Sequence, residues 1–500
     1  MSEQAGSGKK VVLNSVIYTV SGLLQKCFSF FLLPLYTVYL TTEDYGITSI
    51  AGSFVSVAVI IAMCSLQYAV SRFYVELKQD KEKLRRFYGS VVVFSLLSCL
   101  TIGLVLTAFR GVLTKYIFAG IDYYPVVLIC LIQILFNAQH TIYAYILQSQ
   151  QKAMKNAALT LVHFLVSVGL NILFVVGFKM GAVGALLASL IAVILYTAYF
   201  WIDMGGKREL VVCLDFGLLK DALKYSVPLM PHNLSTQIAQ FVSRVLIGGA
   251  GTLSDLGIYS VAAQFGNIAD TIQNYVDSAY GPWLYEKLHD QEEGYKKTIQ
   301  QIAGLLAAVI GLFMLGIALF AQDYILLFVE KSFAGAWQYV PWIVLVFAVK
   351  TMYYFYVEVL FYHKKASRLL FTATLTGSIV NVIISAILIP LWGVYGSIAA
   401  DGIAMVIRVG IVVFISKRFE DVGLKVWSFL QNFITVTMFI FIGLAPAYLH
   451  FHNTFSIANF AYKVFVVIAY ICVQMFIHRK VAGRFTRTLL LKLRKRSVKR

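Results

Sequence analysis

The sequence predicts an all-α integral membrane protein with about 14 transmembrane helices, arranged as two six-helix bundles followed by a C-terminal helix pair. Three observations support this fold class. Of the 500 residues, 59% are hydrophobic and only 13% are charged, whereas a soluble domain carries about 25% charged residues. The apolar residues gather in long runs, and parts of the chain repeat. The same composition excludes an intrinsically disordered chain, a collagen-like fibre and a disulfide scaffold.

Fourteen apolar runs are long enough to cross a hydrocarbon core of about 30 Å, which takes roughly 20 residues of helix. They lie near residues 11–37, 46–70, 87–109, 123–148, 156–178, 181–202, 222–248, 256–285, 298–320, 337–362, 369–389, 394–416, 426–449 and 455–478. The first run has no small-residue cleavage site after it, so we expect it to be an uncleaved span.

The basic residues are distributed unevenly between the two sides of the membrane. With the N-terminus placed in the cytoplasm, 33 Lys and Arg residues fall on the cytoplasmic side and 4 on the outer side. Because Lys and Arg accumulate in cytoplasmic loops, this distribution predicts that both termini are cytoplasmic. Most of the net charge of +18 therefore reflects topology, and the basic tail is expected to lie on anionic lipid, with no nucleic acid as a partner.

Three short segments recur at nearly one spacing. The pairs are EDYGITSIA with SDLGIYSVA, GAVGALLA with GVYGSIAA, and Lys152-Ala153 with Lys365-Ala366, at offsets of 211, 212 and 213 residues. Each repeat contains six predicted spans. Because six is even, the two copies have the same orientation in the membrane and are related by a pseudo-two-fold axis along the membrane normal, with the binding site expected between them.

The repeat predicts how the chain is organised. The parts are an N-lobe at 1–203 (helices 1–6), a C-lobe at 204–418 (helices 7–12), an appended helix pair at 419–478 and a basic cytoplasmic tail at 479–500. The motifs GxxxxGK[ST], HExxH and GxSxG are all missing from the sequence. We therefore predict a transporter and not an enzyme, with no catalytic, cofactor-binding or metal site, and leave open coupling to H⁺ or Na⁺.

Nine charged residues lie inside the predicted spans, where a charge at the bilayer centre costs about 3 kcal/mol. Those placed deepest are Lys26, Asp270, Lys350, Asp401 and Arg408. Those nearer span ends are Arg244, Asp277, Glu358 and Lys463, of which Glu358 and Lys463 are expected at the membrane interface. Two interpretations of the deep set stay open: a charged lumen, or structural ion pairs such as Lys26 with Asp270 and Arg408 with Asp401.

Several segments, taken in order, resemble the Wzx-type polysaccharide flippases of the multidrug/oligosaccharidyl-lipid/polysaccharide exporter superfamily. They are LTTEDYGITSIA, AVSRFY, QSQQKAMKNA, KYSVPLMPHNL and SDLGIYSVA, and the resemblance extends from about residue 8 to residue 480. It implies a V-shaped fold of twelve core helices plus two. It also implies alternating-access transport of an undecaprenyl-pyrophosphate-linked oligosaccharide across the bacterial cytoplasmic membrane, with membrane lipids, a polysaccharide polymerase and glycosyltransferases as candidate partners.

A basic lumen suits an anionic substrate, because Lys and Arg hold phosphate oxygens in a low-dielectric cavity. The resemblance adds that lipid II flippases carry basic residues in helix one and around helices seven and eight, regions similar to those of Lys26 and Arg244. We expect Asp270 and Asp401 to act in gating or ion coupling. The expected substrate-binding residues are Lys26, Arg244, Lys350 and Arg408.

Two other functions fit the same sequence. A cation-coupled multidrug exporter of the same fold would be expected to favour carboxylates in its lumen, which Asp270 and Asp401 provide and Lys26 opposes. A membrane scaffold for a glycan assembly complex would not need buried charges in both bundles. Growth on toxic cations tests the first alternative, and transport in liposomes tests the second.

Overall fold

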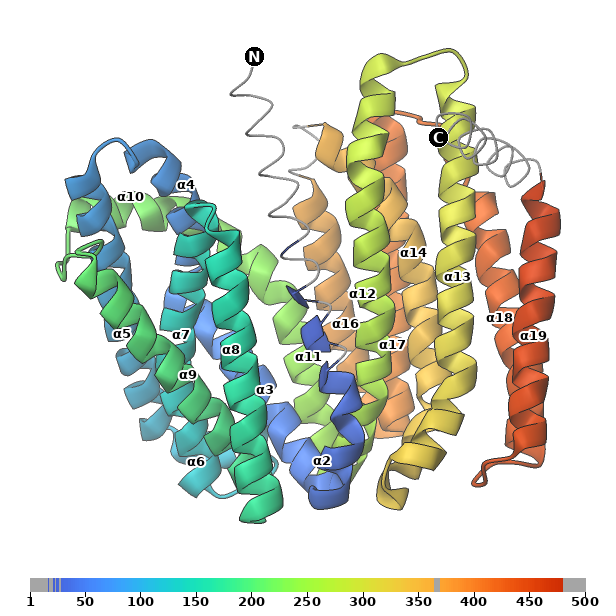
Figure 1. The fold of residues 1–500 in the computed structure, drawn as a ribbon, viewed down its shortest axis with the longest axis horizontal. Helices are drawn as coiled ribbons and strands as arrows, with labels where there is room; N and C mark the ends of the chain where they lie inside the picture. Colours follow the sequence, from blue (N-terminus) through green and yellow to red (C-terminus); the bar gives the residue numbers. More distant parts are fainter. Residues whose placement is uncertain (1–16, 18–20, 23, 27, 364–368, 480–500) are drawn as a thin grey trace, which may run out of the picture. The chain divides into compact units, whose positions relative to one another are not determined.

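The computed structural model describes residues 17, 21–22, 24–26, 28–363 and 369–479 (Figure 1). Eleven helices in this part of the chain are long and apolar enough to cross a membrane. The predicted all-α membrane fold is therefore confirmed. The repeated Lys365-Ala366 and all of the basic tail after Arg479 lie outside the described residues, as does most of the first predicted span.

The chain divides into two compact units. Unit 1 contains the residues up to Ser260 together with Asn381–Ser397, and unit 2 contains Val261–Val380 and the residues from Ile398 onward. The helices that contribute residues to both units are α12 (Leu253–Asp290), α16 (Leu370–Trp392) and α17 (Val394–Phe419). The lobe boundaries expected from the sequence remain predictions.

Unit 1 is built around the packed helices α3, α7 and α9, with α8 and α11 beside them. In this unit α9 packs against α7 and α8, while α3 packs against α7 and α11 (Figure 1). The helices are α2 (Leu33–Tyr39), α3 (Thr42–Met63), α4 (Leu66–Leu77), α5 (Lys81–Ala108), α6 (Arg110–Val112), α7 (Leu128–Ser149), α8 (Ala153–Asn171), α9 (Gly181–Gly206), α10 (Phe216–Ser226) and α11 (Met230–Ala250). Short π or 3-10 turns join them at η1 (Leu113–Ile117), η2 (Tyr123–Val127), η3 (Ile172–Gly177) and η4 (Val227–Leu229).

Unit 2 is centred on α13, against which α14, α18 and α19 pack. The last two helices lie side by side, as the orange and red ribbons of Figure 1 show. The elements of unit 2 are α13 (Tyr295–Phe328), the 3-10 turn η5 (Lys331–Gln338), α14 (Val340–Tyr362), α18 (Val426–Leu449) and α19 (Ile457–Ile477).

The sequence repeat is visible in how α3 and α12 begin. The Thr41 hydroxyl accepts a hydrogen bond from the Asp44 amide at 3.1 Å, and the Asp44 carboxylate accepts one from the Thr41 amide at 3.0 Å. Thr252 and Asp255 make the same two bonds, each at 3.0 Å. Such a reciprocal cap satisfies amides that would otherwise lack partners at a helix start. The equivalent glycines Gly181 and Gly393 share a left-handed φ of +55°.

Two of the predicted spans are interrupted. The span expected at 46–70 breaks between α3 and α4, where Cys64 and Ser65 adopt left-handed φ angles of 48° and 57°. Ser65 is fully buried, and its hydroxyl accepts a hydrogen bond at 3.3 Å from the Asn233 amide on α11. The span expected at 222–248 divides into α10, η4 and α11 because Pro228 and Pro231 stand at helix starts, where proline needs no backbone partner.

The predicted count of 14 spans is approximate. Helices α11 and α12 fall in predicted spans but are not among the eleven apolar ones. The α11 sequence MPHNLSTQIAQFVSRVLIGGA explains this, because His, Asn, Gln, Ser and Arg side chains alternate with its apolar residues. A spanning helix of this kind must place its polar side chains against protein or a water-filled cavity.

Candidate functional site

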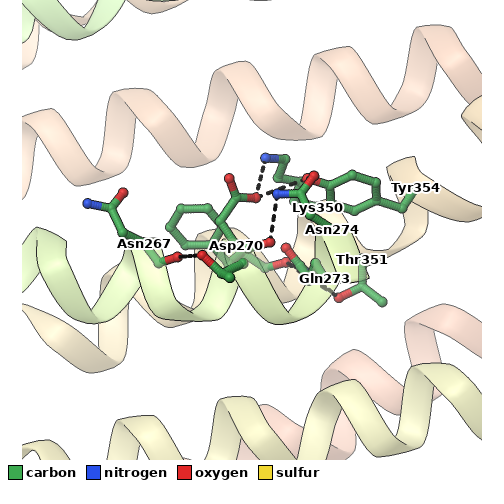
Figure 2. Close-up of polar contacts among 9 residues, drawn as sticks. Asn267, Asp270, Gln273, Asn274, Lys350, Thr351 and Tyr354 are labelled. Carbon is green, nitrogen blue, oxygen red and sulfur yellow. Dashed lines mark hydrogen bonds and ion pairs between the residues drawn. The ribbon is translucent and has the colours of Figure 1, made fainter. Parts of the chain in front are cut away.

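The main polar cluster of unit 2 lies between α12 and α14. Figure 2 shows Asp270 and Lys350 pointing toward one another across these helices, with the Lys350 ammonium 2.6 Å from the Asp270 carboxylate. The Tyr354 hydroxyl lies 3.0 Å from Asp270 Oδ1 and 3.0 Å from Asn274 Oδ1. A charged pair with a phenol beside it is therefore built into the packing of two helices.

A second set of hydrogen bonds holds the two helices in register. Gln273 on α12 donates to the Phe347 carbonyl at 2.6 Å and to the Thr351 hydroxyl at 2.8 Å, both on α14. Gln273 is fully buried, so these bonds satisfy an amide NH₂ group that would otherwise be costly to bury. Because both bonds flank Lys350 in the sequence, they also fix where its side chain leaves α14.

The Asp270–Lys350 pair is only partly buried. The Lys350 side chain is 18% exposed and that of Asp270 is 30% exposed. The Lys350 ammonium also lies 5.1 Å from the centre of the Tyr354 ring, within reach of a cation–π interaction. The pair is therefore sheltered enough for a strong electrostatic interaction, while part of each side chain remains exposed.

Arg408 occupies a separate place in unit 2, between α17 and α16. Its guanidinium donates to the Ser378 hydroxyl at 3.3 Å, and a methyl group added at Gly377 would come 2.8 Å from its Nε. Gly377 thus provides the space for this side chain. Asp401, two turns earlier on α17, interacts electrostatically with Arg408. Within the described residues, the buried Nε has no hydrogen-bond partner.

Two further predicted residues, Arg244 and Lys26, lie in unit 1. Arg244 on α11 donates to the Ser53 hydroxyl on α3 at 2.5 Å, and its side chain is half-buried. Lys26 lies in a helical segment before α2 and is exposed. The structure thus brings Asp270 together with Lys350 and places Asp401 near Arg408 on one helix, while Arg244 and Lys26 belong to the other unit.

Sequence reasoning was wrong about Lys463 and Glu358, which were expected at the membrane interface. Lys463 is completely buried, and its ammonium lies 2.7 Å from both the Asp323 carboxylate and the Gln322 side-chain oxygen. Glu358 is 8% exposed and accepts a hydrogen bond from the Tyr285 hydroxyl. Both side chains find partners inside the protein, which removes the reason for them to reach toward water.

Asp323 was missed altogether, because the predicted span ended at residue 320. The structure continues α13 to Phe328 and buries Asp323 at 4% exposure. The apolar run Tyr324–Phe328 directly after Asp323 is the signal that could have revealed it. A carboxylate between two apolar runs is more economically explained by an ion pair within a helix bundle than by a loop.

Comparison with known proteins places the chain in a family. The model of the family described as polysaccharide biosynthesis protein matches residues 11–288. Among curated proteins, an uncharacterized membrane protein of Haemophilus influenzae is 24% identical over 371 residues, covering 73% of this chain and 87% of the relative. Lsg locus putative protein 1 of the same organism is 23% identical, covering 78% of this chain and 96% of the relative.

Two solved structures share the fold. The lipid II flippase MurJ, in an inward closed conformation, superposes with a TM-score of 0.70 at 15% identity, covering 93% of this chain and 100% of MurJ. An inward-facing multidrug resistance MATE family transporter of the MOP superfamily gives 0.55 at 18% identity, covering 83% of this chain and 95% of the transporter. At these identities the likeness concerns the fold.

Proposed function

Because the chain belongs to the polysaccharide biosynthesis protein family, we propose that it is a flippase for a lipid-linked oligosaccharide. Its substrate is an oligosaccharide carried on undecaprenyl pyrophosphate, which it moves across the bacterial cytoplasmic membrane by alternating access during polysaccharide biosynthesis. The partly exposed Asp270–Lys350 ion pair is the observation that carries this proposal. The headgroup of such a lipid is anionic, and a lipid flippase must hold it away from bulk water.

Ion exchange at Lys350 explains why an acid accompanies the lysine. Without substrate, Asp270 neutralises Lys350 at 2.6 Å and avoids the penalty of an unpaired charge inside the membrane. A pyrophosphate carries more negative charge than one carboxylate, so it competes with Asp270 for the ammonium group. Release of the headgroup lets Asp270 return, and the same pair therefore serves both binding and gating.

Three more basic residues complete the proposed binding set, namely Arg408, Arg244 and Lys26. The Nε–H group of Arg408 can donate a hydrogen bond to a ligand, because it is buried without a hydrogen-bond partner among the described residues. Arg244 is half-buried, and its guanidinium donates to the Ser53 hydroxyl. Guanidinium groups suit phosphate oxygens through their forked donors. We assign all three to headgroup neutralisation, and Asp401 to tuning of Arg408.

The proposed orientation places both termini in the cytoplasm, in keeping with the excess of Lys and Arg on that side. Membrane lipids surround the helices, and a polysaccharide polymerase and glycosyltransferases are the expected neighbours in the pathway. The chain acts in transport and leaves chemical bonds unchanged.

Transport in proteoliposomes tests the proposal. Full-length protein is reconstituted with undecaprenyl-pyrophosphate-linked oligosaccharide, and the fraction that reaches the outer leaflet is measured. We expect Lys350→Ala to reduce the initial rate at least tenfold and Lys350→Arg to retain a measurable rate, because the arginine keeps the charge. Lys331→Ala, which removes an exposed lysine at the start of η5, is the matched control and should transport at the wild-type rate.

The same variants separate the alternatives. A cation-coupled multidrug exporter would protect cells against toxic cations and would be disabled by Asp270→Asn more than by Lys350→Ala. A membrane scaffold would support glycan assembly in cells, yet purified protein would move no lipid in liposomes. Either result would overturn the flippase assignment, whereas lipid movement that depends on Lys350 supports it.

A further inference from the structure

Helices α12 and α14 carry a second layer of acidic residues beyond the Asp270–Lys350 pair. Asp277 follows Asp270 by seven residues, and Glu358 follows Lys350 by eight. At about 1.5 Å per residue, these spacings place the second layer about 10–12 Å further along both helices. Both layers belong to unit 2, so the structure describes their packing directly.

The Asp277 and Glu358 carboxylates of this second layer interact with one another electrostatically, and few hydrogen bonds stabilise their negative charge. Asp277 interacts electrostatically with Glu358, and its buried Oδ1 has no hydrogen-bond partner in the described part of the chain. Glu358 is 8% exposed and accepts one hydrogen bond, from Tyr285. Two adjacent carboxylates in a low-dielectric setting do not both remain ionised, and a proton on one of them removes the repulsion.

Tyr280 provides a second, independent indication of a binding site. Its side chain is 2% exposed, and its hydroxyl is buried without a hydrogen-bond partner among the described residues. That hydroxyl interacts electrostatically with both Glu358 and Asp277, so it belongs to the same cluster as the acidic pair. A buried hydroxyl left unpaired is costly, so this cluster contains a hydrogen-bonding group that is not yet satisfied.

The backbone also makes room for the Glu358 carboxylate. A methyl group added at Gly281 would come 2.7 Å from Glu358 Oε2. Any larger residue at this position of α12 would push the Glu358 carboxylate away from Tyr285 and from Asp277. The site is therefore assembled from one turn of α12, containing Asp277, Tyr280 and Gly281, and the facing end of α14.

We propose that Asp277 and Glu358 together bind one exchangeable proton, and that this proton sets the negative charge around Lys350. The proton comes from solvent and binds a carboxylate oxygen, so no other bond changes. Its role in transport rests on the proposed flippase function. Protonation weakens the electrostatic attraction between Lys350 and the surrounding carboxylates, so that Lys350 can bind the anionic headgroup. The pair would then couple transport to H⁺.

The surrounding groups favour a proton over a metal cation. Lys350 acts electrostatically on Asp277, and Arg408 is linked to the cluster through Tyr353. Both are cations and would repel a bound metal ion, whereas a protonated carboxyl group is neutral. Among the described residues, the other titratable groups that interact electrostatically with the pair are phenols: Tyr280, Tyr285, Tyr353, Tyr354 and, next to Tyr280, Tyr356.

Infrared difference spectroscopy on the full-length purified protein tests the proton site without any substrate. The carbonyl stretch of one protonated carboxyl group should appear as the pH is lowered in Na⁺-free buffer. We expect Asp277→Asn and Glu358→Gln each to abolish that band. Asp270→Asn, an acid on the same helix that is paired with Lys350, is the matched control and should keep a titrating band.

The link to Lys350 has its own measurement. The Asp270→Asn variant is compared with the double variant Asp270→Asn/Lys350→Met. The two differ only in the positive charge of Lys350, and neither has an unpaired carboxylate at position 270. We expect the double variant to titrate at higher pH, because loss of a nearby positive charge favours the protonated form.

Four results would overturn the inference: a band that survives in both acid variants, no titrating band in the wild-type protein, a requirement for Na⁺, or an unchanged midpoint in the double variant. Size-exclusion elution of each variant confirms that it is folded. Failure of lipid transport in proteoliposomes would refute the flippase function while leaving these spectra unaffected, so the two failures are distinguishable.

Discussion

Gly46 and Gly257 occupy equivalent positions in the two sequence repeats, and each faces the backbone at the start of the other's helix. A methyl group added at Gly46 would overlap the Leu253 carbonyl oxygen, and one added at Gly257 would overlap that of Thr42. Leu253 is the repeat equivalent of Thr42, so the contact is reciprocal. The Thr42 and Ser254 hydroxyls lie 2.6 Å apart beside it. The starts of α3 and α12 therefore meet about a local two-fold axis.

This reciprocal contact predicts the effect of a single methyl group. Gly46→Ala should destabilise the protein by about 1–3 kcal/mol, because the overlap is with backbone that cannot move aside. Gly257→Ala should cost a similar amount. The apparent melting temperature in detergent, followed by size-exclusion fluorescence, measures both.

Gly52→Ala is the control for this experiment, since it lies on the same helix and its added methyl group would meet nothing within 4 Å. It should melt at or above the wild-type temperature, because alanine favours helix over glycine. Equal melting of all three variants would contradict the close contact.

Asp44 and Asp255 should differ in importance although both cap a helix. Asp44 Oδ1 also accepts a hydrogen bond from the Ala182 amide at 2.7 Å, which ties α3 to the start of α9. Loss of a cap costs about 1 kcal/mol, and loss of a hydrogen bond to a charged group costs about 1.5–3 kcal/mol more. Asp44→Ala should therefore lower the melting temperature clearly more than Asp255→Ala does, and equal shifts would argue against the α9 contact.

Lys463 and Asp323 should stabilise the protein only as a pair. Lys463→Met leaves a buried, unpaired carboxylate and is expected to cost about 3–5 kcal/mol, whereas Lys463→Met/Asp323→Leu should recover most of that loss. Denaturation of the full chain in a mild detergent measures the three stabilities. A double variant as unstable as the single one would show that the polar network around Gln322 and Asn459 matters more than the ion pair.

Gly377 should matter for transport although it carries no charge. Gly377→Ala would displace the Arg408 guanidinium, whose Nε lies 2.8 Å from the added methyl group. We expect the transport rate to fall several-fold while the protein still elutes as a folded species. Gly410→Ala, two residues from Arg408 on α17 with nothing within 4 Å of the new methyl group, is the control and should transport normally.

The membrane character, the helical fold class and the duplication follow from the sequence because each depends on local or repeated patterns. Apolar runs report contact with lipid wherever they fold, and the repeated Thr-x-x-Asp-x-Gly pattern encodes the same cap at residues 41 and 252. The break at Cys64–Ser65 was not predictable in this way, and there the side chain of Asn233, from a distant helix, donates a hydrogen bond to Ser65.

Most of the charged residues inside the membrane were likewise available from the sequence, since a charge in an apolar run stands out; Asp323 was missed because the predicted span ended at residue 320. Which charges are partnered was decided only by the tertiary structure. Lys463 meets Asp323 across 140 residues of sequence, and Lys350 meets Asp270 across 80. The free energy of a buried charge depends on groups within a few ångströms, and those groups are brought there by helix packing, which hydropathy along one helix does not record.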